Sequence, residues 1–442
     1  MTSAEEMITA MEKSQIFRHV PNFLARWRRW IPLAVFAAAA VTTLTFWKIL
    51  PDKFRLNEQS DYPGYYEPLA RSLIQGHGLN VNGEPATAYP PVYSLVLAGV
   101  FQLSHWFHVS DDFGLDALAI SSMGLISILI FSIARTLWGE LTAIISSFVW
   151  LTYPCALWLT KQPNTELPFM VVFYAGFVLF WHALLRERVL WYLYFGAGVL
   201  FGAAMLIRPI AIGIGFVFAV AILLIRRGTP MRLRLALMAA LLLGNFITIL
   251  PWEAYAYQKT GRIVMLGTVG VNGIRDGLTF AVDSKDYRKD FDVSPDVASV
   301  MNEINSRVRE VLTLRDVVTV VSSEFQAHPV AMSKLYLLKI TRSWYGTDSG
   351  RNEWLILLIQ IPYLLLSVWG ALTVWRRGGI DRGLVITVLL MVAYFWGMTV
   401  LALSILRYMG PVTGLLFLLV AGGVSPFKPT PLRWPRSEGN RI

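Results

Sequence analysis

The sequence predicts an all-α polytopic membrane protein with about ten transmembrane helices, an amphipathic helix on the outer surface and a small extracytoplasmic helical subdomain. Of its 442 residues, 55% are hydrophobic and only 15% are charged, whereas a soluble domain carries roughly 25% charged residues. The mean hydropathy is +0.51. The chain therefore has too little polar surface to cover a water-soluble globule. Its single cysteine, Cys155, excludes an intramolecular disulfide and a cysteine-based zinc site.

Eleven segments are candidates for membrane spans, because a span needs about 17–25 predominantly apolar residues. They are residues 31–50, 90–107, 115–138, 141–159, 167–185, 189–207, 210–225, 235–252, 354–375, 384–405 and 408–424. Both termini are basic, with Arg26, Arg28 and Arg29 at one end and Lys428, Arg433, Arg436 and Arg441 at the other. Lys and Arg are enriched in cytoplasmic segments, so both ends are expected in the cytoplasm and the number of spans should be even.

Residues 90–107 are the segment that we expect not to span. The segment opens with Pro90-Pro91 and ends in His105 and Trp106, which is typical of an interfacial helix. If it lies on the outer surface, the basic loops that follow later spans all fall in the cytoplasm. The sequence therefore predicts ten spans.

Five regions follow from this topology. The extracytoplasmic loop contains apolar residues at helical spacing, which predict an amphipathic helix: Val297, Met301, Ile304, Val308, Val311 and Leu312. A second helical stretch runs from Pro329 to Trp344. The expected regions are a basic cytoplasmic N-terminus (1–30), an N-terminal transmembrane module (31–252) with an outer loop (51–114), an extracytoplasmic loop (253–353), C-terminal spans (354–424) and a basic cytoplasmic tail (425–442).

The first outer loop carries an ordered set of motif residues. It contains Asp61, Tyr65, the triplet Gly76-His77-Gly78, and the run Pro90-Pro91-Val92-Tyr93. This order resembles the GT-C superfamily of membrane glycosyltransferases, and most closely the branch that holds the protein O-mannosyltransferases and the aminoarabinose transferases that modify lipid A.

The resemblance continues along most of the chain. Six further segments occur in the same order as the corresponding segments of the family: Arg135–Gly139, Asn164-Thr165-Glu166, Arg208-Pro209, Pro251-Trp252, Gly267–Gly273 and Arg407-Tyr408. Two departures stand out. Asp61 is followed by Tyr62 where the family often has a second acid, and Trp252 is followed by Glu253 where the family usually has an Arg-Asn pair.

The resemblance implies that a sugar leaves a polyprenyl phosphate and joins an acceptor hydroxyl at the outer membrane face. Such a reaction needs a general base for the acceptor and fixed positive charge for the departing phosphate. Asp61 is the expected base, and Glu58 and Glu67 are its rivals in the same loop. Glu166 is the second catalytic candidate, as an acid that orients the acceptor or binds a metal. A single displacement with inversion is expected, because retention would need a second carboxylate as nucleophile.

Positive charge at the outer boundary supplies the expected phosphate site. Arg208 and Arg407 each lie at an outward hairpin between apolar spans, where ionisable residues usually have a defined partner. Lys339 and Arg342, on the second amphipathic helix, are expected to add to this clamp. Tyr65 and His77, in the first outer loop, complete the expected substrate-binding residues.

Two other functions remain open at this point. One is an O-antigen ligase or polymerase, and the other is a flippase or transporter of lipid-linked sugars. The expected partners are a polyprenyl-phosphate-sugar donor, a glycan, lipid or protein acceptor, and membrane lipids, but no nucleic acid. The expected enzyme transfers a hexose or pentose. A divalent metal is compatible with the resemblance, and the sequence selects no ligands for it. The expected location is the cell (inner) membrane, with the active site facing the periplasm or cell exterior.

Overall fold

The computed structural model describes residues 27–51, 61–186, 188–279, 293–307, 313–347 and 350–425. Helices dominate this part of the chain. Its strands are β1 (Asn80–Val81) and β2 (Glu84–Pro85), an antiparallel hairpin in which Val81 pairs with Glu84. The prediction of an all-α polytopic fold is therefore confirmed.

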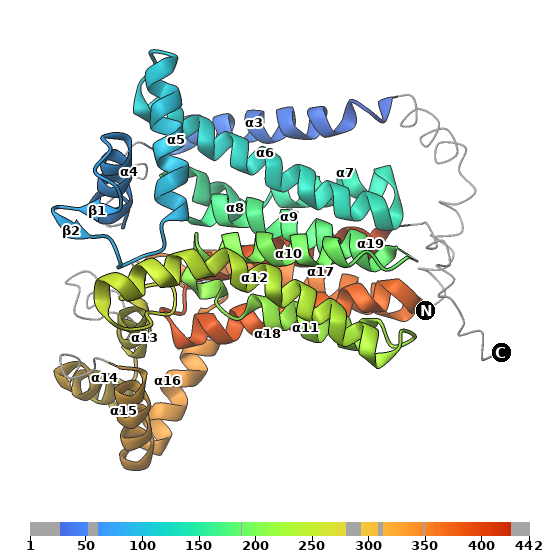
Figure 1. The fold of residues 1–442 in the computed structure, drawn as a ribbon. Coiled ribbons are helices and arrows are strands. Elements are labelled where there is room, and N and C mark those ends of the chain that lie inside the picture. Colours follow the sequence, from blue (N-terminus) through green and yellow to red (C-terminus); the bar gives the residue numbers. More distant parts are fainter. Residues whose placement is uncertain are drawn as a thin grey trace.

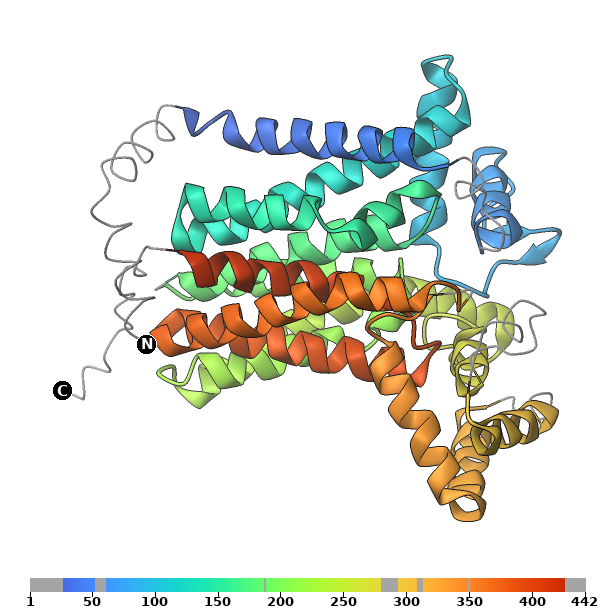
Figure 2. The same cartoon turned by 180° about the vertical axis from the view of Figure 1, so that it is seen from behind.

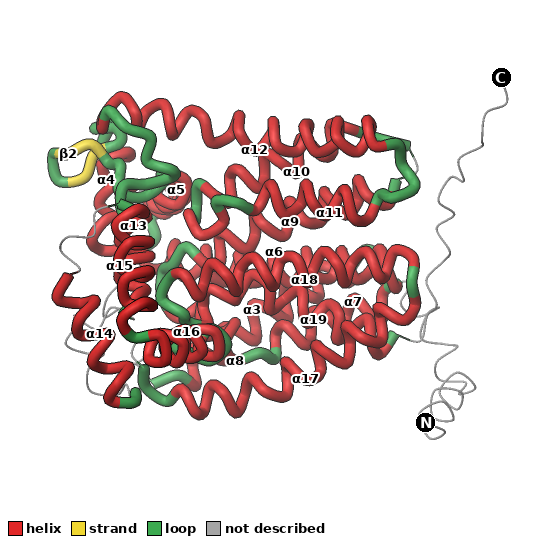
Figure 3. Tube along the Cα trace, turned by 90° about the horizontal axis from the view of Figure 1, so that it is seen from below, coloured by secondary structure: helices red, strands yellow, loops and turns green. Residues whose placement is uncertain are grey.

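A bundle of roughly parallel helices forms the body of the molecule (Figures 1 and 3). Its members are α3 (Ile31–Ile49), α6 (Asp111–Trp138), α7 (Glu140–Leu151), α8 (Pro154–Trp158), α9 (Glu166–Leu185), α10 (Trp191–Met205), α11 (Ile214–Ile225), α12 (Met231–Thr260), α17 (Glu353–Arg377), α18 (Gly379–Leu401) and α19 (Gly410–Val424). Short helical turns precede three of them: η3 (Leu159–Lys161), η4 (Pro209–Ala211) and η7 (Leu406–Met409).

The ten predicted spans all fall on helices of this bundle. Among the described residues, seven helices are long and apolar enough to cross a membrane: α3, α6, α9, α12, α17, α18 and η7 with α19. An eighth is the pair of α7 with α8 and η3, and the remaining two, α10 and η4 with α11, are shorter apolar helices.

The predicted span 141–159 is broken rather than straight. Its two halves meet at an angle of 60°. Pro154 opens the second half, and proline has no N–H to continue the hydrogen-bond ladder of α7. The break turns the chain toward Glu166 at the start of α9.

Helix α5 (Val92–Trp106) lies across the ends of the bundle helices (Figure 1). It buries Tyr93, Leu97 and Phe101, while Leu95 and Leu103 are exposed. This orientation agrees with the predicted surface helix. The η2 turn (Tyr62–Tyr66) and α4 (Glu67–Ile74) pack beside it at the same end.

A second, smaller group of helices projects from that end of the bundle (Figure 2). It comprises α13 (Gly270–Leu278), α14 (Pro295–Arg307), α15 (Leu314–Ala327) and α16 (Pro329–Arg342). These helices share a core of their own that includes Val300, Ile304, Val320 and Leu335. The structure confirms the predicted helices at α14 and α16, whereas α13 and α15 were not predicted. Val308, Val311 and Leu312 lie outside the described residues.

Helices α10 and α12 approach each other backbone to backbone. A Cβ on Gly198 would lie 1.9 Å from the carbonyl oxygen of Leu241, and one on Gly244 would lie 2.2 Å from that of Phe195. Small residues permit such close approach where lipid offers no hydrophobic drive for helix association. We call this contact the glycine seam.

The start of α3 and the end of α19 lie at the same end of the bundle, opposite α5 (Figures 1 and 2). This arrangement agrees with an even number of spans. Arg135 in the last turn of α6 and Arg376 in the last turn of α17 belong to the helix ends on that side.

Candidate active site

A buried carboxylate and two arginines meet at the α5 end of the bundle. Glu166 Oε1 lies 2.6 Å from Nη1 of Arg208 and 3.6 Å from Nε of Arg407. The side chain of Glu166 is 6% exposed, that of Arg208 is 11% exposed and that of Arg407 is 33% exposed. Two positive charges and one negative charge leave an excess of one positive charge, so this cluster can accept an anion.

Local structure fixes each member of the cluster. Asn164 Oδ1 accepts hydrogen bonds from the backbone N–H groups of Glu166 and Leu167 and so caps the start of α9. Arg208 has an extended backbone between α10 and η4, as expected for a residue before proline. The η7 turn that carries Arg407 is tied down through Leu406, whose N–H donates to the Gly346 carbonyl over 2.8 Å.

Tyr408 lies beside both guanidinium groups. Its ring centroid is 5.1 Å from Cζ of Arg208 and 5.5 Å from Cζ of Arg407. Cations within about 6 Å of an aromatic ring are attracted to its face. One ring therefore helps to hold two arginines that are almost 200 positions apart in the sequence.

Asp61, the predicted base, is exposed at the start of η2 and accepts a hydrogen bond from the Tyr89 hydroxyl over 2.9 Å. Its rivals differ. Glu67 forms an ion pair with Arg71 at 2.7 Å, and Arg71 also contacts Asp111 at 3.1 Å. Glu58 lies outside the described residues.

A group of tyrosines packs beside Asp61. The Tyr66 ring packs against Tyr89 at 5.3 Å and Tyr93 at 5.0 Å. Burial raises the pKa of Tyr66 well above its usual value, and the charge of Asp61 adds to the rise. The positive charge of Arg208 lowers the pKa of Tyr66, and the negative charge of Glu166 raises it. Tyr66 is therefore within electrostatic reach of both charged groups.

Tyr65 belongs to the same aromatic group. Its hydroxyl donates to the Tyr89 carbonyl over 3.1 Å. Burial raises the pKa of Tyr65 to about 12, so it remains a neutral donor at physiological pH. In this structure Tyr65 supports the backbone that carries Tyr89.

Comparisons with known proteins find a family model and solved structures to which this chain is similar. A family model described as dolichyl-phosphate-mannose-protein mannosyltransferase matches residues 88–255, a stretch that contains Tyr89, Glu166 and Arg208. The archaeal oligosaccharyltransferase AglB from Archaeoglobus fulgidus, solved in complex with an inhibitory peptide and a dolichol-phosphate, has a similar fold. The TM-score is 0.52 with 12% identity over 89% of this chain and 50% of that chain.

Over residues 88–255 the chain is thus similar to this mannosyltransferase family, and its fold is similar to that of AglB. It spans about half the length of the AglB chain. ArnT from Cupriavidus metallidurans, solved bound to undecaprenyl phosphate, superposes with a TM-score of 0.42 at 13% identity, over 89% of this chain and 78% of that one. A search of curated proteins gives no match.

A turn in the connection between α12 and α13 supports the site. Met265 and Leu266 have left-handed backbones, with φ of 48° and 77°, which is a costly conformation for such side chains. Glu253 and Trp252 hold the turn in place. The Glu253 carboxylate accepts from the Leu266 N–H at 2.5 Å, and the Trp252 indole donates to the Leu266 carbonyl at 3.1 Å.

The same turn packs directly on the segment that carries Tyr89. A Cβ on Gly267 would lie 2.3 Å from the Ala88 carbonyl oxygen. The Thr268 N–H donates to the Thr87 carbonyl over 3.0 Å. Glu253, which departs from the usual family residue, is thus linked through this turn to the partner of Asp61.

Lys339 and Arg342 both lie on α16 and are buried. Lys339 Nζ donates to the Gly277 carbonyl over 2.6 Å. Arg342 donates to Glu353 from Nε over 3.0 Å and from Nη2 over 2.6 Å. Both side chains join the outer helices to the bundle in this structure.

His77 is exposed in the turn after α4. Gly76 and Gly78 on either side have φ of 79° and 73°, so the turn needs glycine at both positions. Among the described residues, no hydrogen bond or ion pair joins His77 to Glu166 or to the arginines.

Tyr89 and Tyr408 are the site residues whose roles the sequence did not predict. Tyr89 directly precedes the Pro-Pro pair and Tyr408 belongs to the Arg407-Tyr408 pair of the resemblance, but the partners of both come from distant segments. A tyrosine beside the Pro-Pro pair and another directly after Arg407 were the signals available in the sequence.

Proposed function

We propose that this chain is a glycosyltransferase that moves a sugar from a polyprenyl phosphate to an acceptor hydroxyl. The observation that carries the proposal is the pair of half-buried arginines, Arg208 and Arg407, which together with Glu166 carry one excess positive charge. Tyr66 is within electrostatic reach of both Asp61 and Arg208. AglB, whose fold the chain shares, was solved with dolichol-phosphate, and the matching family model is named for a dolichyl-phosphate sugar donor. A lipid phosphate is the anion that best fits the pair.

In the proposed reaction, Asp61 takes the proton of the acceptor hydroxyl as its oxygen attacks the anomeric carbon. The bond from that carbon to the phosphate oxygen breaks, and the electron pair leaves with the polyprenyl phosphate. Arg208 and Arg407 stabilise the departing phosphate, because guanidinium groups bind phosphate oxygens bidentately. A single displacement of this kind inverts the anomeric carbon.

Glu166 takes the role of holding the two arginines in the proposed mechanism. Its Oε1 contacts both guanidinium groups, and an acid so engaged is a poor proton acceptor. We therefore assign it to positioning the phosphate site. Four other residues remain proposed contributors to substrate binding: Tyr65, His77, Lys339 and Arg342. We propose that they contribute by positioning the helices and turns that carry them, and not by contact with the arginine pair.

The proposed catalytic module comprises residues 31–252, including the outer loop 51–114, with Arg407 supplied by the C-terminal spans 354–424. We propose that the basic end of the bundle faces the cytoplasm, because Lys and Arg are enriched in the cytoplasmic loops of membrane proteins. The site then faces the periplasm or cell exterior of the cell (inner) membrane. A glycan, lipid or protein hydroxyl is the proposed acceptor.

Release of the lipid phosphate tests the proposal. Membranes carrying the protein are incubated with polyprenyl-phosphate-linked hexoses and pentoses and an extract of the cell envelope. Free polyprenyl phosphate is then measured by mass spectrometry. Asp61→Asn should abolish release while donor binding persists, because losing a general base costs about 10²–10⁴-fold in rate.

Glu67→Gln is the matched control, since Glu67 is an acid of the same loop that is engaged by Arg71. It should retain release, and so should Glu58→Gln. If Asp61→Asn keeps near-normal turnover and a control loses it, the base is another acid of this loop. Absence of release by the wild-type protein with every donor would overturn the proposed function itself.

A further inference from the structure

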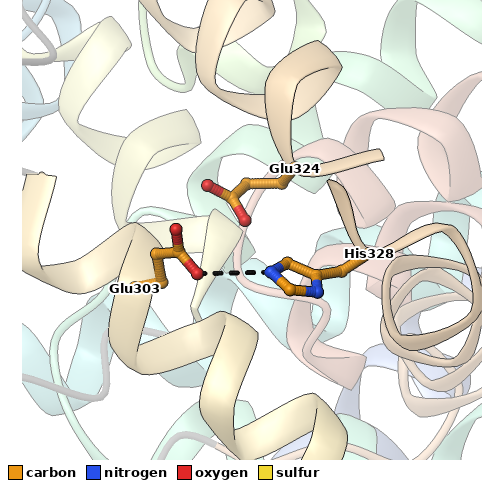
Figure 4. Close-up of side chains that lie close together, drawn as sticks. All are labelled: Glu303, Glu324 and His328. Atoms are coloured by element: carbon orange, nitrogen blue, oxygen red, sulfur yellow. Dashed lines mark ion pairs between the residues drawn. The ribbon is translucent and has the colours of Figure 1, made fainter. Parts of the chain in front are cut away.

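Three metal-ligating side chains from three outer helices converge away from the proposed active site (Figure 4). Glu303 comes from α14, Glu324 from α15, and His328 from the junction of α15 and α16. One donor atom of each lies within 4.8 Å of the other two. Among the described residues, this is the group of histidine and acid side chains whose donors are close enough to share an ion.

Glu324 is the member that most needs a further partner. It is 2% exposed, and its Oε1 forms an ion pair with Arg307 Nη1 at 3.1 Å. Its Oε2 is also buried, and within the described part of the chain it has no hydrogen-bond partner. Leaving a buried charged oxygen unsatisfied is costly. Figure 4 shows the Glu324 carboxylate directed toward the gap between Glu303 and His328.

The other two ligands already have the spacing of a metal site. His328 Nε2 lies 3.4 Å from Glu303 Oε2. Bonds of about 2.0–2.2 Å in a tetrahedral zinc site place neighbouring ligand atoms roughly 3.3–3.6 Å apart. Both side chains are about half exposed, at 47% and 50%, so a small movement toward Glu324 is open to them.

We propose that Glu303, Glu324 and His328 bind one zinc ion, with water completing the tetrahedron. The mixed set of one imidazole and two carboxylates suits Zn²⁺ better than Mg²⁺ or Ca²⁺, which prefer oxygen ligands alone. Without a cation, two carboxylates face one Arg307 and one histidine. A bound zinc ion supplies the missing positive charge and ties α14, α15 and α16 together around their small core.

Zinc titration of the purified full-length chain tests this site. The protein in detergent is treated with EDTA, exchanged into chelator-free buffer and titrated with ZnCl₂ in a calorimeter. The expected result is one zinc per chain with a Kd in the micromolar range or tighter. His328→Ala and Glu303→Gln should each weaken binding at least tenfold, and both side chains are exposed enough for the variants to fold.

His77→Ala is the matched control, because His77 is an exposed histidine outside the group. It should bind zinc like the wild type. Zinc should also slow proteolysis of the 293–342 region in the wild type and in His77→Ala, but not in His328→Ala. The proposal would be overturned if both ligand variants bound zinc as tightly as the wild type. It would also be overturned if the wild type bound no zinc at about 100 μM, or bound Ca²⁺ more tightly than zinc.

Discussion

The contacts of Glu166 show how single residues shape this site. A buried ion pair costs desolvation, and that cost is met only when geometry and further hydrogen bonds are good. Here one carboxylate serves two guanidinium groups that also lie over one tyrosine ring. The arginines are therefore held in place before any phosphate arrives.

Removing either arginine should weaken binding of a lipid phosphate. A hydrogen bond to a charged group contributes about 1.5–3 kcal/mol, or about 10- to 150-fold in affinity. We expect losses in this range for Arg208→Ala and Arg407→Ala, measured as binding of a short-chain polyprenyl phosphate in nanodiscs. Lysine at either position should restore affinity only partly, because it lacks the planar fork of arginine.

Arg262→Ala serves as the control for charge alone, since Arg262 is exposed in the turn after α12. Its affinity should match that of the wild type. Should both site variants bind as tightly as the wild type, Arg208 and Arg407 would be contacts to lipid headgroups rather than a phosphate site.

Lys339 predicts a dependence of stability on pH. Burial lowers its pKa to about 7, whereas an unfolded lysine has a pKa near 10.4. Between these values the unfolded chain holds a proton that the folded chain does not, so the free energy of unfolding rises with pH. Below about pH 7 the penalty for burying the charge is fully present.

Lys339→Met should therefore gain most over the wild type near pH 6–7, and the gain should shrink toward pH 10. Its total size is on the order of a few kcal/mol. Thermal unfolding in detergent across this pH range measures the difference. Lys334→Met, on the exposed side of α16, should show little of this trend, and a flat difference for Lys339→Met would contradict the assignment.

At the scale of elements, the turn after α12 links a strained backbone to the proposed base. Gly267→Ala should push the turn away from Ala88 and so disturb Tyr89, the partner of Asp61. Since misplacement by about 1 Å can cost about 10²-fold in rate, we expect transfer to fall about tenfold or more in an otherwise folded protein.

Gly273→Ala is the control, because a Cβ at Gly273 meets nothing within 4 Å. Lipid-phosphate release and thermal unfolding are measured for both variants. Equal release from Gly267→Ala and Gly273→Ala would show that the turn does not position Tyr89.

The sequence predicted the helices of the bundle better than the contacts of the site. Apolar runs identified each span, because lipid exposure requires them over the whole length. The 60° break at Pro154 and the helix α15 were missed, since a continuous apolar run hides a bend and α15 has only a narrow apolar face. The contact of Glu166 with Arg407 joins residues far apart in the chain, and no local pattern encodes such a pairing.

For the whole molecule, the testable property is topology. With ten spans and α5 on the outer surface, reporter fusions after Gly139 and after Arg227 should report the cytoplasm. A fusion after Gly261, beyond α12, should report the outside. An outside signal at Arg227 would contradict the arrangement, because that loop would then have crossed the membrane.

The glycine seam has a consequence for biogenesis. Helix α10 has 15 residues, or about 22 Å at 1.5 Å per residue, which is shorter than the roughly 30 Å hydrocarbon core. Helix α12, which α10 contacts through the glycine seam, begins at Met231. At a synthesis rate of about 5–20 residues per second, Met231 is added a few seconds after the end of α10. We therefore expect α10 to stay with the insertion machinery until α12 emerges, so that the two enter the bilayer as a late, joint step of synthesis.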